Sequence, residues 1–104
     1  MTVNEIANRL SATIVTDAGK ETSGFYVGDF LSRVMGKAPS GCCWLTVMNN
    51  VNVAGVATLA EISAVVLCEG VEPDARLTEK CGDEGISLLT TKLGAFEASA
   101  ELSK

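Results

Sequence analysis

Four cysteines and a cluster of asparagines are the side chains of this sequence that come nearest to a chemical site. The cysteines stand at 42, 43, 68 and 81. No pair of them has the Cys-x-x-Cys spacing of zinc ribbons or ferredoxin clusters. The sequence contains no histidine, which excludes Ser–His and Cys–His catalysis and histidine metal ligation. We therefore predict no catalytic residue, no metal site, no cofactor and no enzymatic activity.

Two interpretations of the cysteines remain open. Cysteine often serves as a small buried hydrophobic residue, and this structural role is the one that we favour. The alternative is a redox or metal-binding role. Cys42 and Cys43 precede one predicted strand, whereas Cys68 ends the next. Because these strands should be parallel, the two groups are expected at opposite ends of the sheet, which weighs against one shared cluster.

An asparagine-rich loop follows the first of two strongly apolar segments and precedes a predicted helix. In open α/β sheets, ligands bind at the carboxyl ends of the strands, and amide side chains can both donate and accept hydrogen bonds. The loops after the other central strands should share that edge. The candidate ligand contacts are Asn49, Asn50, Asn52, Glu69 and Lys92. The alternative is that these asparagines only form turns and helix caps.

Length and composition indicate one globular domain over residues 1–104, with 47% hydrophobic and 5% aromatic residues. A core of small side chains suggests that a partner subunit covers some apolar surface. The net charge is −5 and no Lys/Arg cluster occurs, which argues against binding nucleic acid or an anionic membrane. No apolar segment approaches the length needed to span a bilayer, and we expect no signal peptide in Met1–Glu5, which has neither a basic start nor an apolar stretch. We expect a cytoplasmic protein with reduced thiols.

Strands and helices alternate along the sequence. The segments Trp44–Met48 and Ala64–Cys68, joined by a helical stretch, predict two parallel central strands, and Ile86–Thr90 a third. Shorter strands are predicted at Thr13–Thr16 and Phe25–Val27. The pattern predicts a single compact α/β domain with a mostly parallel sheet flanked by helices.

Local signals mark the predicted helices. Thr2 and Glu5 form a capping-box pattern at the first helix, and Pro73-Asp74 opens another that ends at Gly82. Asp29 is predicted to cap a helix that Gly36 closes. The residues that we expect to face the core from the helices are Val3, Ile6, Ala7, Leu10, Phe30, Leu31, Val34, Met35, Val53, Val56, Ala57, Ala60, Leu77, Cys81, Phe96 and Ala100. Gly55 is expected to permit close helix packing.

Three segments together resemble a known family. They are Tyr26–Met35, the pair Trp44–Met48 and Asn52–Ala57, and the pair Ile86–Thr90 and Phe96-Glu97. These residues resemble the short stand-alone DRTGG-domain proteins over nearly the whole chain. The resemblance implies a fold like the amino-terminal domain of HPr kinase/phosphorylase. It also implies a Gly-Gly-Asp-Arg-type turn after the central strand, where this chain has Asn49 to Asn52 instead.

The resemblance implies a regulatory or dimerising role, as in related modules of some phosphotransacetylases and of pyrophosphatases with CBS domains. Our first hypothesis is a non-catalytic regulatory or protein-interaction domain, homodimeric and with a possible protein partner. The second is a sensor that binds a nucleotide or metabolite at the asparagine-loop edge. The third is an accessory protein of a redox or hydrogenase pathway, because short members of the family occur near iron-hydrogenase and serine-kinase genes, which implies a redox or signalling setting.

Overall fold

A computed structural model describes all 104 residues, and its five strands form one sheet in the order β1-β5-β4-β3-β2. Strands β2 to β5 are parallel to one another, and β1 pairs antiparallel with β5 at one edge. The single α/β domain with a mostly parallel sheet is therefore confirmed. The strands are β1 (Thr13–Thr16), β2 (Phe25–Val27), β3 (Cys43–Thr46), β4 (Ala64–Leu67) and β5 (Ser87–Thr90).

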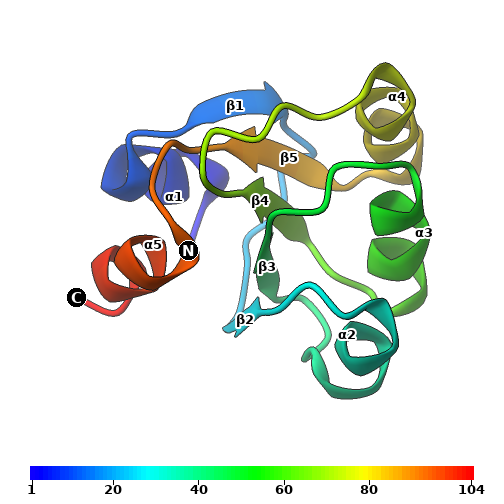
Figure 1. Cartoon of the computed structure of the whole chain (residues 1–104), viewed down its shortest axis with the longest axis horizontal. Coiled ribbons are helices and arrows are strands. Elements are labelled where there is room, and N and C mark those ends of the chain that lie inside the picture. The colour runs from blue at the N-terminus through cyan, green and yellow to red at the C-terminus, as the bar shows by residue number, and fades with distance from the viewer.

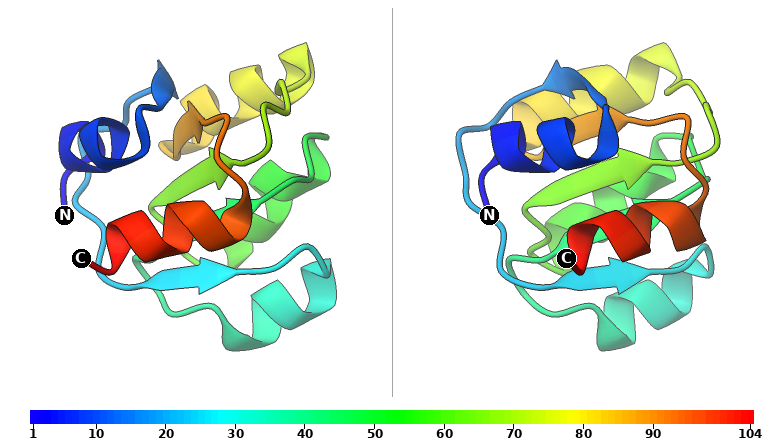
Figure 2. Two further views of the ribbon diagram at one scale, coloured as in Figure 1. Left: turned by 60° about the vertical axis from the view of Figure 1, so that its left-hand side comes forward. Right: turned by 90° about the vertical axis from the view of Figure 1, so that its left-hand side faces the viewer.

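Helices cover both faces of the sheet (Figure 1). The three helices on one face are α2 (Leu31–Lys37), α3 (Asn52–Leu59) and α4 (Ala75–Glu84). The two on the other face, α1 (Val3–Leu10) and α5 (Ala95–Leu102), lie in front of the sheet in the right-hand view of Figure 2. Each face has its own hydrophobic cluster. No helix is both long enough and apolar enough to cross a membrane.

The centre of the fold is the β3–β4 ladder, in which every residue of both strands is buried. A strand that is covered on both faces needs apolar side chains in both directions, which explains the uninterrupted apolar segments. Trp44 is fully buried, and its indole Nε1 donates to the Gly28 carbonyl oxygen at 2.8 Å. The indole is thus a core residue with its polar atom satisfied.

Two helix starts follow the sequence signals closely. The amide of Glu5 donates to Thr2 Oγ1 at 3.1 Å, and the Thr2 amide donates to Glu5 Oε1 at 2.9 Å, so the capping box at α1 is confirmed. At α4, Asp74 Oδ1 accepts from the Leu77 amide at 2.7 Å. The inward positions of Leu77 and Cys81 are also confirmed.

The predicted role of Asp29 is wrong. Helix α2 begins at Leu31 with Phe30 as its N-cap, and no side chain caps it. Asp29 Oδ1 instead accepts from Thr46 Oγ1 at 2.7 Å and from the Val47 amide at 2.9 Å. The carboxylate therefore holds the β2–α2 connection against the end of β3, because the polar groups at that strand end need a partner.

Several predicted helix faces and ends also need correction. Phe30 and Met35 are exposed, because α2 lies at the edge of the sheet and only its Val34 is fully buried. Phe96 and Ala100 are exposed as well, since α5 begins at Ala95 and turns a different stripe, including Ala98 and Leu102, toward the sheet. Helix α2 continues through Gly36 to Lys37, and α4 continues through Gly82 to Glu84. Gly55 faces open space rather than a packed neighbour.

We expect Asp29→Ala to lower the free energy of unfolding by about 1–2 kcal/mol, because two donors lose an ionised acceptor at a solvent-accessible site. Urea denaturation would measure the change. Asp83→Ala is the matched control, since Asp83 is exposed on α4 and makes no side-chain hydrogen bond or ion pair. Equal losses in the two variants would contradict the structural role of Asp29.

Candidate ligand-binding edge of the sheet

Loops from several elements meet at the carboxyl edge of the parallel strands. The Glu69 amide donates to the Leu93 carbonyl oxygen at 2.8 Å, and the Gly70 amide donates to the Thr91 carbonyl oxygen at 2.9 Å. These bonds join the β4–α4 loop to the β5–α5 loop. Because β1 is antiparallel, its first residues lie at the same edge. Thr13 pairs with Thr90 there, an arrangement that sequence reasoning did not anticipate.

Asn49 links two of these loops. Its side-chain Nδ2 donates to the Glu72 carbonyl oxygen at 2.7 Å, and its own carbonyl oxygen accepts from the Asp74 amide at 3.2 Å. The side chain thus fastens the β3–α3 loop to the β4–α4 loop, just before Asp74 caps α4. A ligand contact from Asn49 stays a prediction, but its amide nitrogen already has this structural partner.

The other two asparagines lie at the start of α3. Asn50 Oδ1 accepts from the Asn52 amide at 2.9 Å and closes a local turn there. Asn52 is the first helical residue, and its side chain is exposed. Turn formation therefore describes Asn50, as the alternative interpretation proposed. Ligand binding by either residue is still a prediction.

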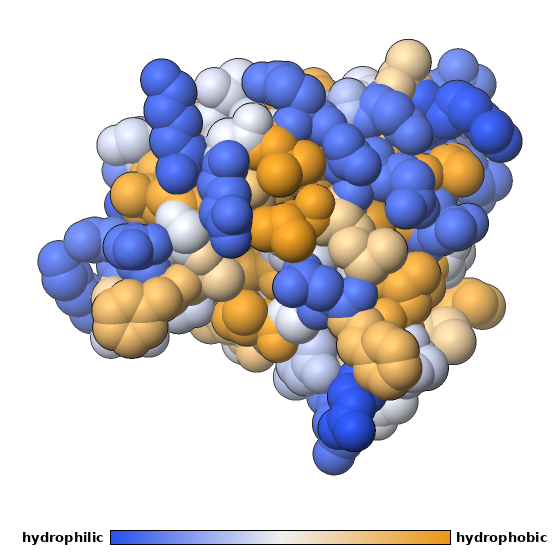
Figure 3. Space-filling model, viewed as in Figure 1, coloured by the Kyte–Doolittle hydropathy of each residue, from blue (hydrophilic) through white to orange (hydrophobic).

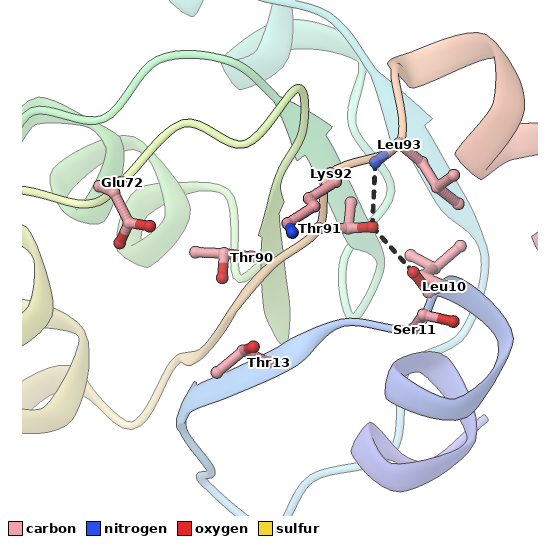
Figure 4. Close-up of a pocket in the computed structure, with 8 residues that line it drawn as sticks. All are labelled: Leu10, Ser11, Thr13, Glu72, Thr90, Thr91, Lys92 and Leu93. Carbon is pink, nitrogen blue, oxygen red and sulfur yellow. Dashed lines mark hydrogen bonds between the residues drawn. The ribbon is translucent and has the colours of Figure 1, made fainter.

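A hollow of about 480 Å³ lies beside the end of β5. Its size is within the range of small-molecule sites. Lys92 is the one predicted contact that lines it, whereas the three asparagines and Glu69 do not. Figure 4 shows its lining residues, which are Leu10, Ser11, Thr13, Glu72, Thr90, Thr91, Lys92 and Leu93.

The hollow offers both charged and hydroxyl groups. Lys92 makes no ion pair within the protein, so its ammonium group is free to attract an anionic group. In Figure 4 the side chains of Thr13 and Thr90 face the same space as Lys92, and Glu72 stands across from them. The Thr91 hydroxyl is already used, because it donates to the Leu10 carbonyl oxygen at 2.8 Å and accepts from the Leu93 amide at 3.2 Å. The arrangement suits a small polar molecule.

Sequence patterns did not point directly to Thr13, Thr90 or Glu72 as members of this site. Thr13 lines the hollow because β1 is antiparallel to β5, so that the first residue of β1 lies beside the end of β5. The orientation of an edge strand depends on tertiary packing and leaves little trace in a four-residue segment. Glu72 lies three residues after Glu69 in the β4–α4 loop and was not among the predicted contacts.

The four cysteines are buried and unpaired. Burial raises the pKa of every thiol. The pKa of Cys43 rises to about 12, and the neighbouring Cys42 and Cys68 contribute a smaller part of that rise. The pKa values of Cys68 and Cys81 rise to about 11. Reactive cysteines need an accessible thiolate, which these environments disfavour. No three Cys, Asp or Glu side chains gather in a metal-binding arrangement. The thiols thus give the redox-accessory hypothesis no support.

These observations define a five-stranded α/β domain with a polar hollow at one sheet edge. The chain belongs to the DRTGG domain family, whose profile matches residues 5–104. This shows the family that the resemblance indicated. A comparison with curated proteins gave no match.

The fold is also found in a solved structure. The chain superposes with a TM-score of 0.80 and 16% identity on the CBS and DRTGG domains of the regulatory region of Clostridium perfringens pyrophosphatase. That structure is a complex with an activator, diadenosine tetraphosphate. The match covers 97% of this chain and 45% of the other, so this chain spans about half of that region. At this identity the likeness establishes the fold alone.

The raised pKa of Cys43 predicts a pH dependence of stability. The ordinary pKa of the Cys43 thiol is 9.0, so above this pH the unfolded chain loses a proton that the folded chain retains up to about pH 12. The stabilisation is therefore complete below pH 9 and is lost as pH rises, by about 1.4 kcal/mol per pH unit. Urea denaturation of the native chain and Cys43→Ala from pH 7 to 10.5 would measure it. The free energy of unfolding of the native chain should exceed that of Cys43→Ala by less and less as pH rises. A constant difference in this free energy would contradict the prediction.

Proposed function

We propose that this chain is a non-catalytic regulatory domain that acts through association with itself. The observation that carries the proposal is a set of large apolar side chains left exposed on β2, on α2 and at the N-cap of α2. Phe25, Val27, Phe30 and Met35 are 39%, 47%, 66% and 48% exposed. Family membership and the fold of the pyrophosphatase regulatory region also support it.

The exposed side chains are unusual for this chain because its core is built from small residues. Only three phenylalanines occur, and all three are exposed rather than buried. Figure 3 shows apolar groups that interrupt the hydrophilic surface, including groups over α2. Large apolar residues that are not needed in the core commonly mark an interaction surface.

The proposal also includes a cytoplasmic location and no catalytic activity of the domain itself. Four buried free thiols fit a reducing compartment, which supports a cytoplasmic location. The absence of histidine and the protonated state of the thiols support a domain without catalysis of its own. The scattered basic residues support a protein or small-molecule partner rather than nucleic acid.

Sedimentation equilibrium of the full chain tests the association. We expect a reversible dimer at tens of micromolar, weakened at least about tenfold by Phe30→Ser, because most of that ring is exposed in the single chain. Leu59→Ser is the matched control, since Leu59 is 76% exposed at the end of α3 and belongs to neither β2 nor α2. A monomer throughout this range would contradict the homodimer.

The hollow beside β5 favours a second candidate function, a small-ligand sensor. Its support is the free ammonium group of Lys92 among hydroxyl groups in a space of ligand size. A phosphate or carboxylate group could lie against Lys92, whereas the carboxylate of Glu72 would favour a donor on the same ligand. Nucleotides belong in the test set because the activator of the pyrophosphatase region is one.

Thermal unfolding with nucleotides, phosphates and small acids tests the sensor. A ligand at a hundred times its dissociation constant should add about 2.7 kcal/mol and raise the midpoint by roughly 10 °C or more. Lys92→Ala should abolish the shift, while Lys37→Ala should keep it, because Lys37 is an exposed lysine on α2, away from the hollow. Equal shifts in both variants would place the ligand elsewhere.

A further inference from the structure

Strand β2 forms an open edge of the sheet. It pairs with β3 alone, with Tyr26 beside Trp44. The Cys43 amide donates to the Gly24 carbonyl oxygen at 3.0 Å, and the Gly28 amide donates to the Leu45 carbonyl oxygen at 3.2 Å. In a parallel ladder of this register, the amide and carbonyl groups of Phe25 and Val27 point away from β3. Two amides and two carbonyl oxygens thus face outward.

The two edges of the sheet differ in how they are protected. Edge strand β1 has a register irregularity between Ile14 and Thr16, a device that discourages pairing with another chain. Strand β2 pairs with β3 in an unbroken register. It also lacks the charges and prolines that commonly block an edge strand, because no charged residue or proline occurs between Glu21 and Asp29.

We propose that β2 pairs antiparallel with β2 of a second copy, with the two-fold axis at Tyr26. This inference rests on the proposed function, because it names the surface and the register of the self-association. In this register Phe25 of each copy lies opposite Val27 of the other, and each pair exchanges two hydrogen bonds. All four outward groups of each strand are then satisfied, and the two sheets become one continuous sheet.

The side chains of this strand also match a second copy. Phe25 and Val27 line a small hollow with Leu45, with Ser99 and Leu102 from α5, and with Ser103, the C-cap of that helix. Pairing would place the Phe25 ring of one copy beside Val27 of the other along this hollow. Antiparallel neighbours of this kind, an aromatic beside a β-branched residue, stabilise sheets. Tyr26 points to the other face, where it would meet Tyr26 of the second copy.

Charge and area are compatible with two copies. The chain carries a net charge of −5, but the uncharged segment from 22 to 28 would bring no carboxylates face to face. A whole phenylalanine side chain has an accessible surface of about 200 Å² and a valine somewhat less. On this scale the exposed surface of Phe25, Val27 and Phe30 amounts to roughly 280 Å² in each copy. Two copies together contribute roughly 560 Å² of apolar surface. Because interfaces are a little over half apolar, this implies about 1,000 Å² in total, the lower limit for a specific interface. We therefore expect a reversible dimer.

Amide hydrogen exchange of the unmodified chain tests the register directly. The amides of Phe25 and Val27 should become protected as protein concentration rises through the dimerisation range. The amides of Tyr26 and Gly28, which face β3 in the single chain, should exchange equally slowly at all concentrations. A dimer in which Phe25 and Val27 remain unprotected would overturn the β2 pairing and leave the proposed self-association intact.

A cysteine cross-link tests the same geometry independently. Residues opposite each other in a non-hydrogen-bonded antiparallel pair have Cα atoms about 4.5 Å apart, which a disulfide can bridge. Tyr26→Cys should therefore form a disulfide dimer under mild oxidation, seen on a non-reducing gel. The four native thiols are buried and should not interfere.

Two register controls come from the neighbouring positions. Phe25→Cys and Val27→Cys should cross-link poorly, because like positions would be diagonal neighbours about 7–8 Å apart. Efficient cross-linking at either of these, but not with Tyr26→Cys, would overturn the stated register. A chain that is monomeric by sedimentation and shows neither protection nor cross-linking would overturn both this inference and the self-association.

Discussion

The complete burial of the β3–β4 ladder is the constraint on which the rest of this structure depends. Both strands are apolar in both directions, so each face of the sheet must be covered by helices. This requirement accounts for the two separate hydrophobic clusters, one under α2, α3 and α4 and one under α1 and α5. It also accounts for the parallel strands, because each crossover helix returns the chain to the same end of the sheet.

The helices cover the sheet less completely near β2, and this leaves apolar side chains exposed there. Helix α2 packs beside α3 at the sheet edge and buries fully only Val34. On the other face, α5 reaches as far as the hollow next to Phe25 and Val27 without closing over them. The opposite edge is different, because β1 follows α1 after two residues and pairs with β5 in a broken register. The sheet thus has one protected edge and one open edge.

Sequence patterns predicted the features that depend on neighbours along the chain. The capping box of Thr2 and Glu5, the strands and the inward side of α4 all rest on such local signals. The role of Asp29 could not be read in this way, because its partner Thr46 lies 17 residues away. The face of α5 was mispredicted: Phe96 was expected to face inward, whereas the small Ala98 is the residue that is fully buried. At the candidate site, Lys92 could be predicted because it directly follows a predicted strand. Thr13 could not, because its place there depends on the direction of β1, which local sequence does not determine.

The two candidate sites lie on different strands, and polar contacts along the carboxyl edge connect their surroundings. Glu72 lines the hollow, and its carbonyl oxygen holds Asn49 in the loop after β3. Two residues earlier in that loop, the Val47 amide binds Asp29, which follows the end of β2. A ligand can influence association only by favouring one of two arrangements. The buried ladder is packed too closely to supply two arrangements, because interiors like this have few voids. Communication between the hollow and the β2 edge would therefore have to pass through these loop contacts rather than through the core.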